Sequence, residues 1–247
     1  MISSAFILAA GFGNRMRPWT DLYPKPMLTL GKTPLILWHL EQLFDVGVRH
    51  FFINTHHLSH KLRGFLEFHF EPFSERGARM TISEEEEILG TGGALFHAKT
   101  DISEEYFFLV NSDIFHKIDL RQAAAFHESH SPLATLILKL TDDPSWKQVA
   151  LREDGQISHL GKKALTPDIH ETRFGFTGIH VLSRRIFSYC PEKKYQCIVN
   201  DLYPRAAKNG EKILGFETKA YWKDIGSPEQ FAEAQRDLMN GKFSPPG

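Results

Sequence analysis

The sequence predicts an α/β fold with a mixed, mostly parallel sheet. Two observations carry this prediction. Short apolar runs of strand length alternate with helical patterns through the first half of the chain, and the glycine loop Gly11–Gly13 directly follows the first apolar run. Strands spaced by helices are typical of βαβ units with parallel strands and right-handed crossovers. We expect one domain over residues 1–247.

Periodicity and helix signals place the elements of the first half. Pro34 favours a helix start, because proline suits the first helical position, and Gly47 ends that helix. The other elements follow from apolar runs and helical spacing. The expected strands are 5–10, 51–54, 79–83 and 107–111, and the expected helices are 34–46, about 59–68 and 91–99.

The second half is less regular, although turn and cap signals still divide it. Ser227-Pro228-Glu229-Gln230 is a capping box that opens a helix. The expected strands are 134–140, 148–151, 157–160, 174–182 and 212–217, and the expected helices are 184–189, about 201–208 and 228–239. We expect residues 243–247 to form a loose tail.

Composition excludes several classes of function. The net charge is −1, so no basic field for nucleic acid is expected. No apolar run approaches the roughly 20 residues that span a bilayer, and the N-terminus lacks a signal-peptide pattern. The cysteines, Cys190 and Cys197, have neither zinc nor redox spacing. A cytoplasmic protein with no membrane or nucleic-acid partner is the simplest interpretation.

The stretch from Leu8 to Leu28 carries the clearest functional signal. Small residues come first, so that backbone N–H groups can approach phosphate oxygens closely. Arg15 follows the loop, and Lys25 stands between Pro24 and Pro26. Because proline restricts its own torsion and that of the preceding residue, this ammonium group is mounted on a stiff backbone. The pattern predicts polyphosphate binding.

This stretch resembles the signature of the sugar-1-phosphate nucleotidylyltransferases, Leu-Ala-Ala-Gly-x-Gly-x-Arg-(Met/Leu)-x-Pro-x-Thr followed by Pro-Lys-Pro, with every fixed position filled. The compact members, which act on substrates such as mannose 1-phosphate or N-acetylmuramate 1-phosphate, are the most similar in length. The resemblance implies a Rossmann-like three-layer α/β/α sandwich. It also implies a nucleotide-binding half over about 1–130 and a sugar-phosphate-binding half over about 131–240.

The resemblance further implies a reaction: an NTP and a sugar 1-phosphate give an NDP-sugar and pyrophosphate, as in cell-envelope polysaccharide synthesis. Val110-Asn111-Ser112-Asp113 and Trp222-Lys223-Asp224-Ile225-Gly226 resemble the motifs whose aspartates hold Mg²⁺. The implied catalytic residues are Arg15, on the β- and γ-phosphates, Lys25, on the α-phosphate, and Asp113. Either aspartate by itself would also fit a turn cap.

The implied nucleotide site extends beyond the opening stretch. Leu89-Gly90-Thr91-Gly92-Gly93 resembles the segment beside the base and ribose, and Glu85 matches a position near the base. A helix start and a solvated acidic run are the alternatives. GTP and UTP both remain open. The implied nucleotide-binding residues are Leu8, Ala9, Ala10, Gly11, Gly13, Arg15, Glu85, Gly90, Thr91, Gly92 and Asn111.

The acceptor side matches the family more loosely. Residues 174–179 resemble the strand that lines the sugar pocket, and Asn200 could instead be a helix N-cap. Many relatives carry Glu-Lys-Pro where this chain has Leu160-Gly161-Lys162-Lys163-Ala164. The missing glutamate leaves the sugar open. The implied sugar-phosphate-binding residues are Lys162, Thr177, Gly178, Asn200 and Asp201.

Other functions compete with this interpretation. A CMP transferase for a phospho-alcohol such as phosphocholine would share the fold, and a non-catalytic nucleotide-sensing subunit would share the loop. A dinucleotide oxidoreductase fits poorly, because the third glycine of its G-x-G-x-x-G motif falls at Met16. Monomer and homodimer both remain open.

Overall fold

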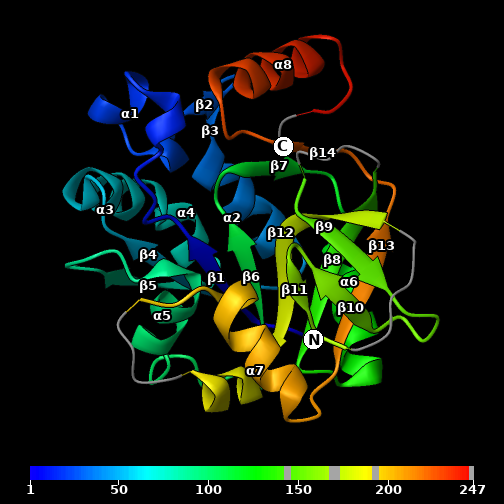
Figure 1. Cartoon of the computed structure of the whole chain (residues 1–247). Helices are drawn as coiled ribbons and strands as arrows, with labels where there is room; N and C mark the ends of the chain where they lie inside the picture. The colour runs from blue at the N-terminus through cyan, green and yellow to red at the C-terminus, as the bar shows by residue number, and fades with distance from the viewer. Residues whose placement is uncertain (142–145, 167–172, 191–194, 245–247) are drawn as a thin grey trace. The chain divides into compact units, whose positions relative to one another are not determined.

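The computed structural model describes residues 1–141, 146–166, 173–190 and 195–244, which form two compact units (Figure 1). Unit 1 comprises Met1–Ile2, Leu89–Leu109 and Asp119–Lys219, and unit 2 comprises Ser3–Ile88, Val110–Ile118 and Ala220–Gly247. Each unit therefore combines segments that are far apart in the sequence. The single domain with a nucleotide half and an acceptor half stays a prediction.

Unit 2 contains the βαβ pattern expected from the first half of the chain. Its parallel strands pair in the order β1-β4-β5, with Ser4 opposite His50 and His50 opposite Arg79. These elements are β1 (Ser4–Leu8), α2 (Leu35–Asp45), β4 (His50–Thr55), α3 (Ser59–His69), α4 (Glu71–Ser74) and β5 (Arg79–Glu84). The predicted strands and helices of this region are confirmed to within a few residues.

Unit 2 also contains smaller elements that the sequence did not predict, together with the predicted helix at its C-terminal end. An antiparallel ribbon joins β7 (Ile114–His116) to β14 (Trp222–Asp224), with Asp224 opposite Ile114. Helix α8 follows at Pro228–Met239, where the Ser227 hydroxyl accepts a hydrogen bond from the Gln230 amide, as the capping box predicts. The remaining short elements are η1 (Asn14–Met16), α1 (Trp19–Leu22), η2 (Lys25–Met27), β2 (Thr29–Leu30) and β3 (Thr33–Pro34).

An aromatic cluster packs behind the ribbon and corrects the prediction of a loose tail. Phe243 is 6% exposed, and its ring lies 4.2 Å from that of Phe115. Trp38 of α2 meets Phe115 edge-on at 4.6 Å. The sequence offers no periodic pattern after Gly241, so the burial of Phe243 is a tertiary effect. Residues 245–247 lie outside the described part of the chain.

Unit 1 holds a mixed set of strands in the order β11-β10-β9-β12-β8-β13. β8 and β13 are parallel, whereas the pairs β10–β11, β9–β10, β9–β12 and β8–β12 are antiparallel. The strands are β8 (Ala134–Leu140), β9 (Gln148–Leu151), β10 (Ile157–Leu160), β11 (Lys163–Ala164), β12 (Arg173–Ser183) and β13 (Ile213–Thr218). β6 (Tyr106–Asn111) begins in unit 1 and ends in unit 2.

The helices of unit 1 include one that the sequence analysis missed. α6 (Leu120–His130) begins at Asp119, whose carboxylate accepts a hydrogen bond from the Arg121 amide. It buries Leu120, Ala123, Ala124 and His127, so a histidine takes a core position. The other helices are α5 (Gly90–His97), η3 (Arg184–Tyr189), the π-helix η4 (Ile198–Leu202) and α7 (Tyr203–Lys208).

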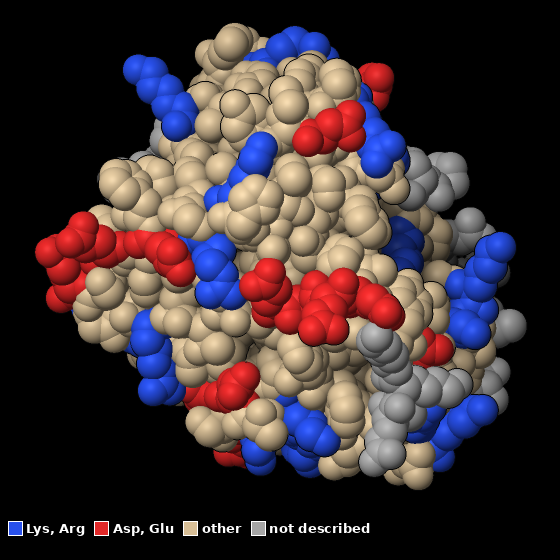
Figure 2. All heavy atoms as spheres, turned by 90° about the vertical axis from the view of Figure 1, so that its left-hand side faces the viewer, with Lys and Arg blue, Asp and Glu red and all other residues tan. Residues whose placement is uncertain are grey.

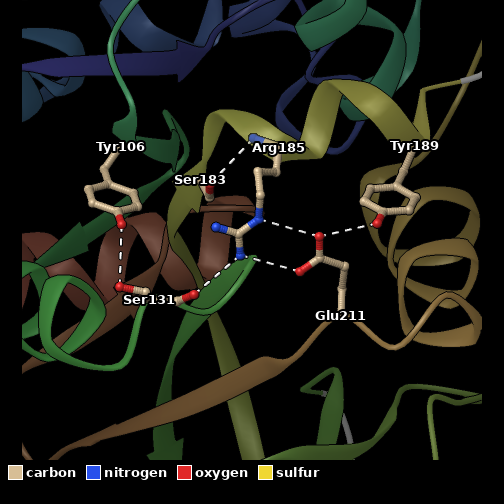
Figure 3. Close-up of polar contacts among 6 residues, drawn as sticks. All are labelled: Tyr106, Ser131, Ser183, Arg185, Tyr189 and Glu211. Carbon is tan, nitrogen blue, oxygen red and sulfur yellow. Dashed lines mark hydrogen bonds and ion pairs between the residues drawn. The ribbon is translucent and has the colours of Figure 1, made fainter.

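A polar cluster ties η3 to neighbouring parts of unit 1, as Figure 3 shows. The Arg185 guanidinium donates to the Ser131 carbonyl at 3.2 Å and to Glu211 Oε2 at 3.3 Å. The Tyr189 hydroxyl donates to Glu211 Oε1 at 3.1 Å. Because Arg185 is partly exposed, these bonds fix local geometry more than they stabilise the fold.

The surface carries both signs of charge. On the face in Figure 2, acidic side chains gather in patches and basic side chains lie between them. In the part of the chain that the structure describes, no helix combines the length and hydrophobicity needed to cross a membrane. Cys190 and Cys197 are both free thiols.

Candidate active site

Gly13 shapes the loop that follows β1. Its φ is +63°, and a Cβ there would lie 2.8 Å from Thr20 Cγ2, so both torsion and space require glycine. The Gly13 carbonyl accepts hydrogen bonds from the Met16 amide at 2.8 Å and from the Thr20 hydroxyl at 2.9 Å. These two hydrogen bonds therefore fix the conformation of the loop.

Lys25 is buried beside this loop. Pro24 and Pro26 flank it, and its side chain is 9% exposed. Its Nζ lies 2.8 Å from Asp113 Oδ2 and donates a hydrogen bond to it. The Lys25 Cβ would be 3.4 Å from a Cβ placed on Gly13. The rigid lysine thus reaches both the glycine loop and the aspartate after β6.

The β7–β14 ribbon brings the two predicted metal ligands together. Asp224 lies opposite Ile114 in the ribbon, and the Ile225 amide donates to the Asp113 carbonyl at 2.9 Å. Burial, and then repulsion from Asp113, raises the pKa of Asp224, while Lys25 and Arg15 oppose the rise. Gln230 donates to Asp224 Oδ2 at 3.4 Å. The two carboxylates therefore repel each other, and Lys25 and Arg15 partly offset that repulsion.

Arg15 is the second cation near the two carboxylates, after Lys25. It is exposed on η1, and its Nη2 would lie 2.6 Å from a Cβ on Gly226. Gly226 therefore leaves the space that the guanidinium uses. Arg17 behaves differently, because it pairs with Asp21 at 3.1 Å on the surface.

The carboxylate pair suits a small hard cation. Mg²⁺ takes oxygen ligands, keeps several waters and needs only one or two protein carboxylates when phosphate oxygens complete its shell. Among the residues that the structure describes, no group of three or more His, Cys, Asp and Glu could hold a metal ion by itself. Asp113 and Asp224 could supply two of the oxygen ligands of such an ion.

Glu85 differs from the rest of its acidic run. It is 4% exposed, whereas Glu84, Glu86 and Glu87 are exposed. Asn54 Nδ2 donates to Glu85 Oε1 at 2.7 Å, and His56 Nδ1 contacts the Glu85 carbonyl at 2.8 Å. The Glu85 carboxylate is therefore oriented by the Asn54 side chain, whereas His56 contacts only the Glu85 backbone.

The same amide side chain also holds the start of the glycine loop. Asn54 Oδ1 accepts a hydrogen bond from the Ala9 amide at 2.7 Å. The Leu8 carbonyl accepts from the Ser112 amide at 3.2 Å and from its hydroxyl at 2.6 Å. Leu8, Ala9 and Ala10 thus contribute backbone, and Gly11 is exposed and uncrowded. Asn111 ends β6 and is partly buried.

Residues 90–92 start α5 in unit 1. Gly90 has φ +69°, and the Gly92 amide donates to the Gln196 carbonyl at 2.9 Å. The Thr91 hydroxyl accepts from the Ile198 amide at 2.9 Å. The Gly92 amide and the Thr91 hydroxyl are therefore engaged within the protein, and Gly90 and Thr91 are partly buried.

The five predicted acceptor residues also lie in unit 1. Lys162 is exposed, and Asn200 and Asp201 are exposed on the π-helix η4. Cys197 is the N-cap of η4, and its amide donates to Asp201 Oδ2 at 2.7 Å. The Thr177 side chain is buried and donates to the Ile137 carbonyl at 2.7 Å. Gly178 has φ +83° within an irregular stretch of β12.

Comparison with protein families gives a match over nearly the whole chain. The model of the family described as "Nucleotidyl transferase" matches residues 4–241. The chain belongs to this nucleotidyl transferase family. The predicted family is therefore confirmed.

Relatives and solved structures agree with this assignment. The chain is 32% identical over 236 residues to "Probable mannose-1-phosphate guanylyltransferase 1" of Oryza sativa subsp. japonica, covering 94% of this chain and 63% of the relative. For "Mannose-1-phosphate guanylyltransferase" of Mycobacterium tuberculosis the identity is 28%, covering 96% and 65%. This nucleotidyl transferase thus spans about two thirds or slightly less of their length.

The solved structures establish the fold. A putative glucose-1-phosphate thymidylyltransferase from Bacillus anthracis superposes with a TM-score of 0.82 at 20% identity, covering 100% of this chain and 98% of that one. HddC from Yersinia pseudotuberculosis gives 0.77 at 23% identity, covering 96% and 99%. The predicted α/β class with a mixed sheet is confirmed.

Sequence reasoning missed several residues that support the site. Asn54 and His56 hold Glu85, Gly226 makes room for Arg15, and Ser112 holds Leu8. Asn54 lies near the carboxyl end of a predicted parallel strand, where α/β ligand sites form, and that position could have indicated it. Gly226 and Ser112 lie within the two motifs that contain the predicted metal ligands, but their roles depend on tertiary contacts that the motifs do not indicate.

Proposed function

We propose that this nucleotidyl transferase transfers a guanylyl group from GTP to a sugar 1-phosphate of the mannose 1-phosphate class, giving a GDP-sugar and pyrophosphate. The observation that carries the proposal is the convergence of Lys25, Asp113 and Asp224, with Lys25 Nζ 2.8 Å from Asp113 Oδ2 and Arg15 beside Asp224. Stiffly held cations beside paired carboxylates are what a metal-bound triphosphate requires.

The chemistry needs positioning more than proton transfer. A phosphate oxygen of the sugar 1-phosphate attacks the α-phosphorus, the α–β bond breaks, and pyrophosphate leaves. The nucleophile is anionic at neutral pH, so no general base is required. Lys25 would stabilise charge on the α-phosphate, and Arg15 would hold the leaving phosphates. Mg²⁺ held by Asp113 and Asp224 would neutralise charge on the phosphates.

Guanine is preferred over uracil because of Glu85. A carboxylate can accept hydrogen bonds from guanine N1–H and N2–H together, whereas uracil offers one N–H. Asn54 Nδ2 orients the buried Glu85 carboxylate by donating to its Oε1, which supports a fixed acceptor rather than a mobile surface charge. The names of the relatives support the same base.

The residues that we propose for the sugar phosphate lie in unit 1. Lys162, Asn200 and Asp201 are exposed and could meet a sugar phosphate, while Thr177 and Gly178 would act through the shape of β12. Gly90 and Thr91, which lie in unit 1, are proposed as further nucleotide-binding residues.

The test is pyrophosphate release over four NTPs crossed with several sugar 1-phosphates and with phosphocholine. We expect the highest kcat/KM with GTP and mannose 1-phosphate. Lys25→Ala and Asp113→Ala should each lower kcat by at least ~10²-fold, the scale of one lost preorganised contact. Faster turnover with CTP and phosphocholine, or binding of GTP without any turnover, would overturn the proposal.

A further inference from the structure

Asn54 lies where the three parallel strands of unit 2 reach the end of their pairing. β1 and β4 pair as far as Leu8 and Asn54, and β4 and β5 pair as far as Thr55 and Glu84. Beyond these pairs, β1 leads into the glycine loop and β5 is followed directly by Glu85. A side chain that spans all three strands at this end can fix the distance between the loop and Glu85.

The Asn54 amide connects the two outer strands in this way. Its Oδ1 accepts a hydrogen bond from the Ala9 amide at 2.7 Å, and its Nδ2 donates to Glu85 Oε1 at 2.7 Å. Because a backbone N–H can only donate, the carbonyl oxygen of the Asn54 side chain must face Ala9, and its NH₂ group must face the carboxylate. Asn54 is 3% exposed, so water competes little for either bond.

The backbone of Glu85 is held independently of the Asn54 side chain. The Glu85 amide donates to the Thr55 carbonyl at 2.8 Å, and His56 Nδ1 contacts the Glu85 carbonyl at 2.8 Å. Loss of the Asn54 donor should therefore leave the Glu85 backbone in place and change the direction of its carboxylate.

We propose that Asn54 is a positioning residue for base selectivity, because its amide holds the Glu85 carboxylate at a set distance from the glycine loop. This inference rests on the proposed function. A guanine edge and its triphosphate can then be bound at the same time, since the groups that meet them are ordered before the nucleotide arrives. Asn54 acts through Glu85 and Ala9 rather than by contact with the nucleotide.

The test compares the binding of GTP with that of ITP, which lacks the 2-amino group of guanine. Calorimetry at pH 8 with Mg²⁺ and without an acceptor measures both Kd values in the absence of turnover. We expect the wild type to bind GTP about tenfold more tightly than ITP, the scale of one hydrogen bond to a charged acceptor. Inorganic tripolyphosphate reports on the phosphate site alone.

Asn54→Asp is the decisive variant. It keeps the shape of the side chain and the acceptor for the Ala9 amide, but it replaces the donor with a second carboxylate that repels Glu85. We expect its Kd values for GTP and ITP to agree within about twofold, because the orientation of Glu85 is lost. Its Kd for tripolyphosphate should stay within about twofold of wild type, because the Ala9 bond remains.

Gln235→Glu is the matched control. Gln235 Oε1 accepts from the Gly31 amide at 2.9 Å, and its Nε2 donates to the Thr29 carbonyl at 2.8 Å, so this amide also joins two partners in unit 2. Neither partner belongs to the proposed nucleotide site. The substitution should therefore leave the preference for GTP over ITP unchanged.

Two results would overturn the positioning role. One is a wild-type preference for GTP over ITP in Asn54→Asp. The other is equal weakening of GTP, ITP and tripolyphosphate, which would show that Asn54 supports only the loop. If Asn54→Asp does not fold, Asn54→Ser, whose side chain is too short to reach both partners, decides by its GTP-to-ITP preference.

The two proposals fail separately. A GTP-selective protein that transfers no nucleotide in the substrate panel contradicts the proposed reaction and leaves the Asn54 comparison decisive. A wild type that binds GTP and ITP equally contradicts Glu85 as the guanine acceptor and, with it, the role of Asn54. An active, GTP-selective wild type whose Asn54→Asp variant is equally selective contradicts the positioning role alone.

Discussion

Lys25 Nζ lies 2.8 Å from Asp113 Oδ2, in a pair whose lysine is 9% and whose aspartate is 36% exposed. The ammonium group thus occupies an oxygen that a divalent cation would need. If the proposed function is correct, Lys25 and a divalent cation would compete for the same carboxylate, and a bound phosphate would weaken the Lys25–Asp113 ion pair by attracting the ammonium group. Loss of Lys25 should therefore change the affinity for a metal ion and the rate of turnover in opposite directions.

Lys25→Met should tighten Mn²⁺ binding to the free protein while it abolishes most turnover. We expect a Kd lower by roughly tenfold, which corresponds to about 1.4 kcal/mol, because the variant loses a competing charge. Turnover should fall at least ~10²-fold. Lys61→Met, at an exposed lysine that donates to the Leu22 carbonyl, is the control and should change neither quantity. Weaker Mn²⁺ binding in Lys25→Met would contradict the competition.

Asp224→Asn should stabilise the protein while it destroys activity. The pKa of Asp224 is raised in the folded state by burial and by Asp113, so its charged form opposes folding at neutral pH. Because the side chain is partly solvated, we expect a gain of about 0.5–1 kcal/mol at pH 7. The gain should shrink as the pH falls through the folded pKa and should vanish below the unfolded pKa, because both states are then protonated.

Urea unfolding at pH 7 and at pH 3.5 measures this difference. Asp113→Asn serves as the comparison and should destabilise the protein at pH 7, because it leaves the buried Lys25 without its carboxylate partner. A loss of stability in Asp224→Asn at pH 7 would show that the repulsion between the carboxylates is not the dominant effect.

Buried histidines should make the fold acid-labile. Burial lowers the pKa of His127 to about 4 and that of His180 to about 3, and His39 and His116 behave alike. The unfolded chain takes up these protons below about pH 6.5 and the folded chain does not, so stability falls as the pH drops. Each histidine contributes a loss of about 2 kcal/mol by pH 5.

His180→Gln tests this with a side chain that can still accept from Tyr203, whose hydroxyl meets His180 Nδ1 at 2.6 Å. The unfolding free energy should depend less steeply on pH between 6 and 5, by about 1.4 kcal/mol per unit for one proton. His60→Gln, at an exposed position, should keep the wild-type slope. An equal slope in both variants would rule out His180 as a source of acid lability.

Gly90→Ala should cost more stability than the torsion alone explains. Gly90 and Gly210 both have positive φ, +69° and +84°, but a Cβ on Gly90 would overlap the Gln196 carbonyl oxygen while a Cβ on Gly210 meets nothing within 4 Å. We expect about 1 kcal/mol for Gly210→Ala and roughly 3 kcal/mol for Gly90→Ala, measured by urea unfolding. Equal losses of stability in the two variants would mean that the Gln196 backbone can move away from the added Cβ at little cost.

Some elements could be predicted because their signals are local. The strands and helices of unit 2 follow from periodicity, and the Ser227 cap depends on residues three apart. Helix α6 was not predicted, because alanines and His127 complete its buried face and its apolar spacing is therefore weak. The burial of Phe243 was not predicted, because no residue near it in the sequence indicates its aromatic partners Trp38 and Phe115.

By itself, the sequence determined the fold class, the glycine loop and the stiff mounting of Lys25, because strand periodicity and proline torsions act over neighbouring residues. Tertiary structure alone decided that Lys25 pairs with Asp113, 88 positions away, and that Glu85 is buried among exposed glutamates. It also placed Gln42 at the end of the ribbon, where its side chain donates to the His116 carbonyl. Such contacts depend on where separate segments meet in space, and no local pattern of residues encodes that.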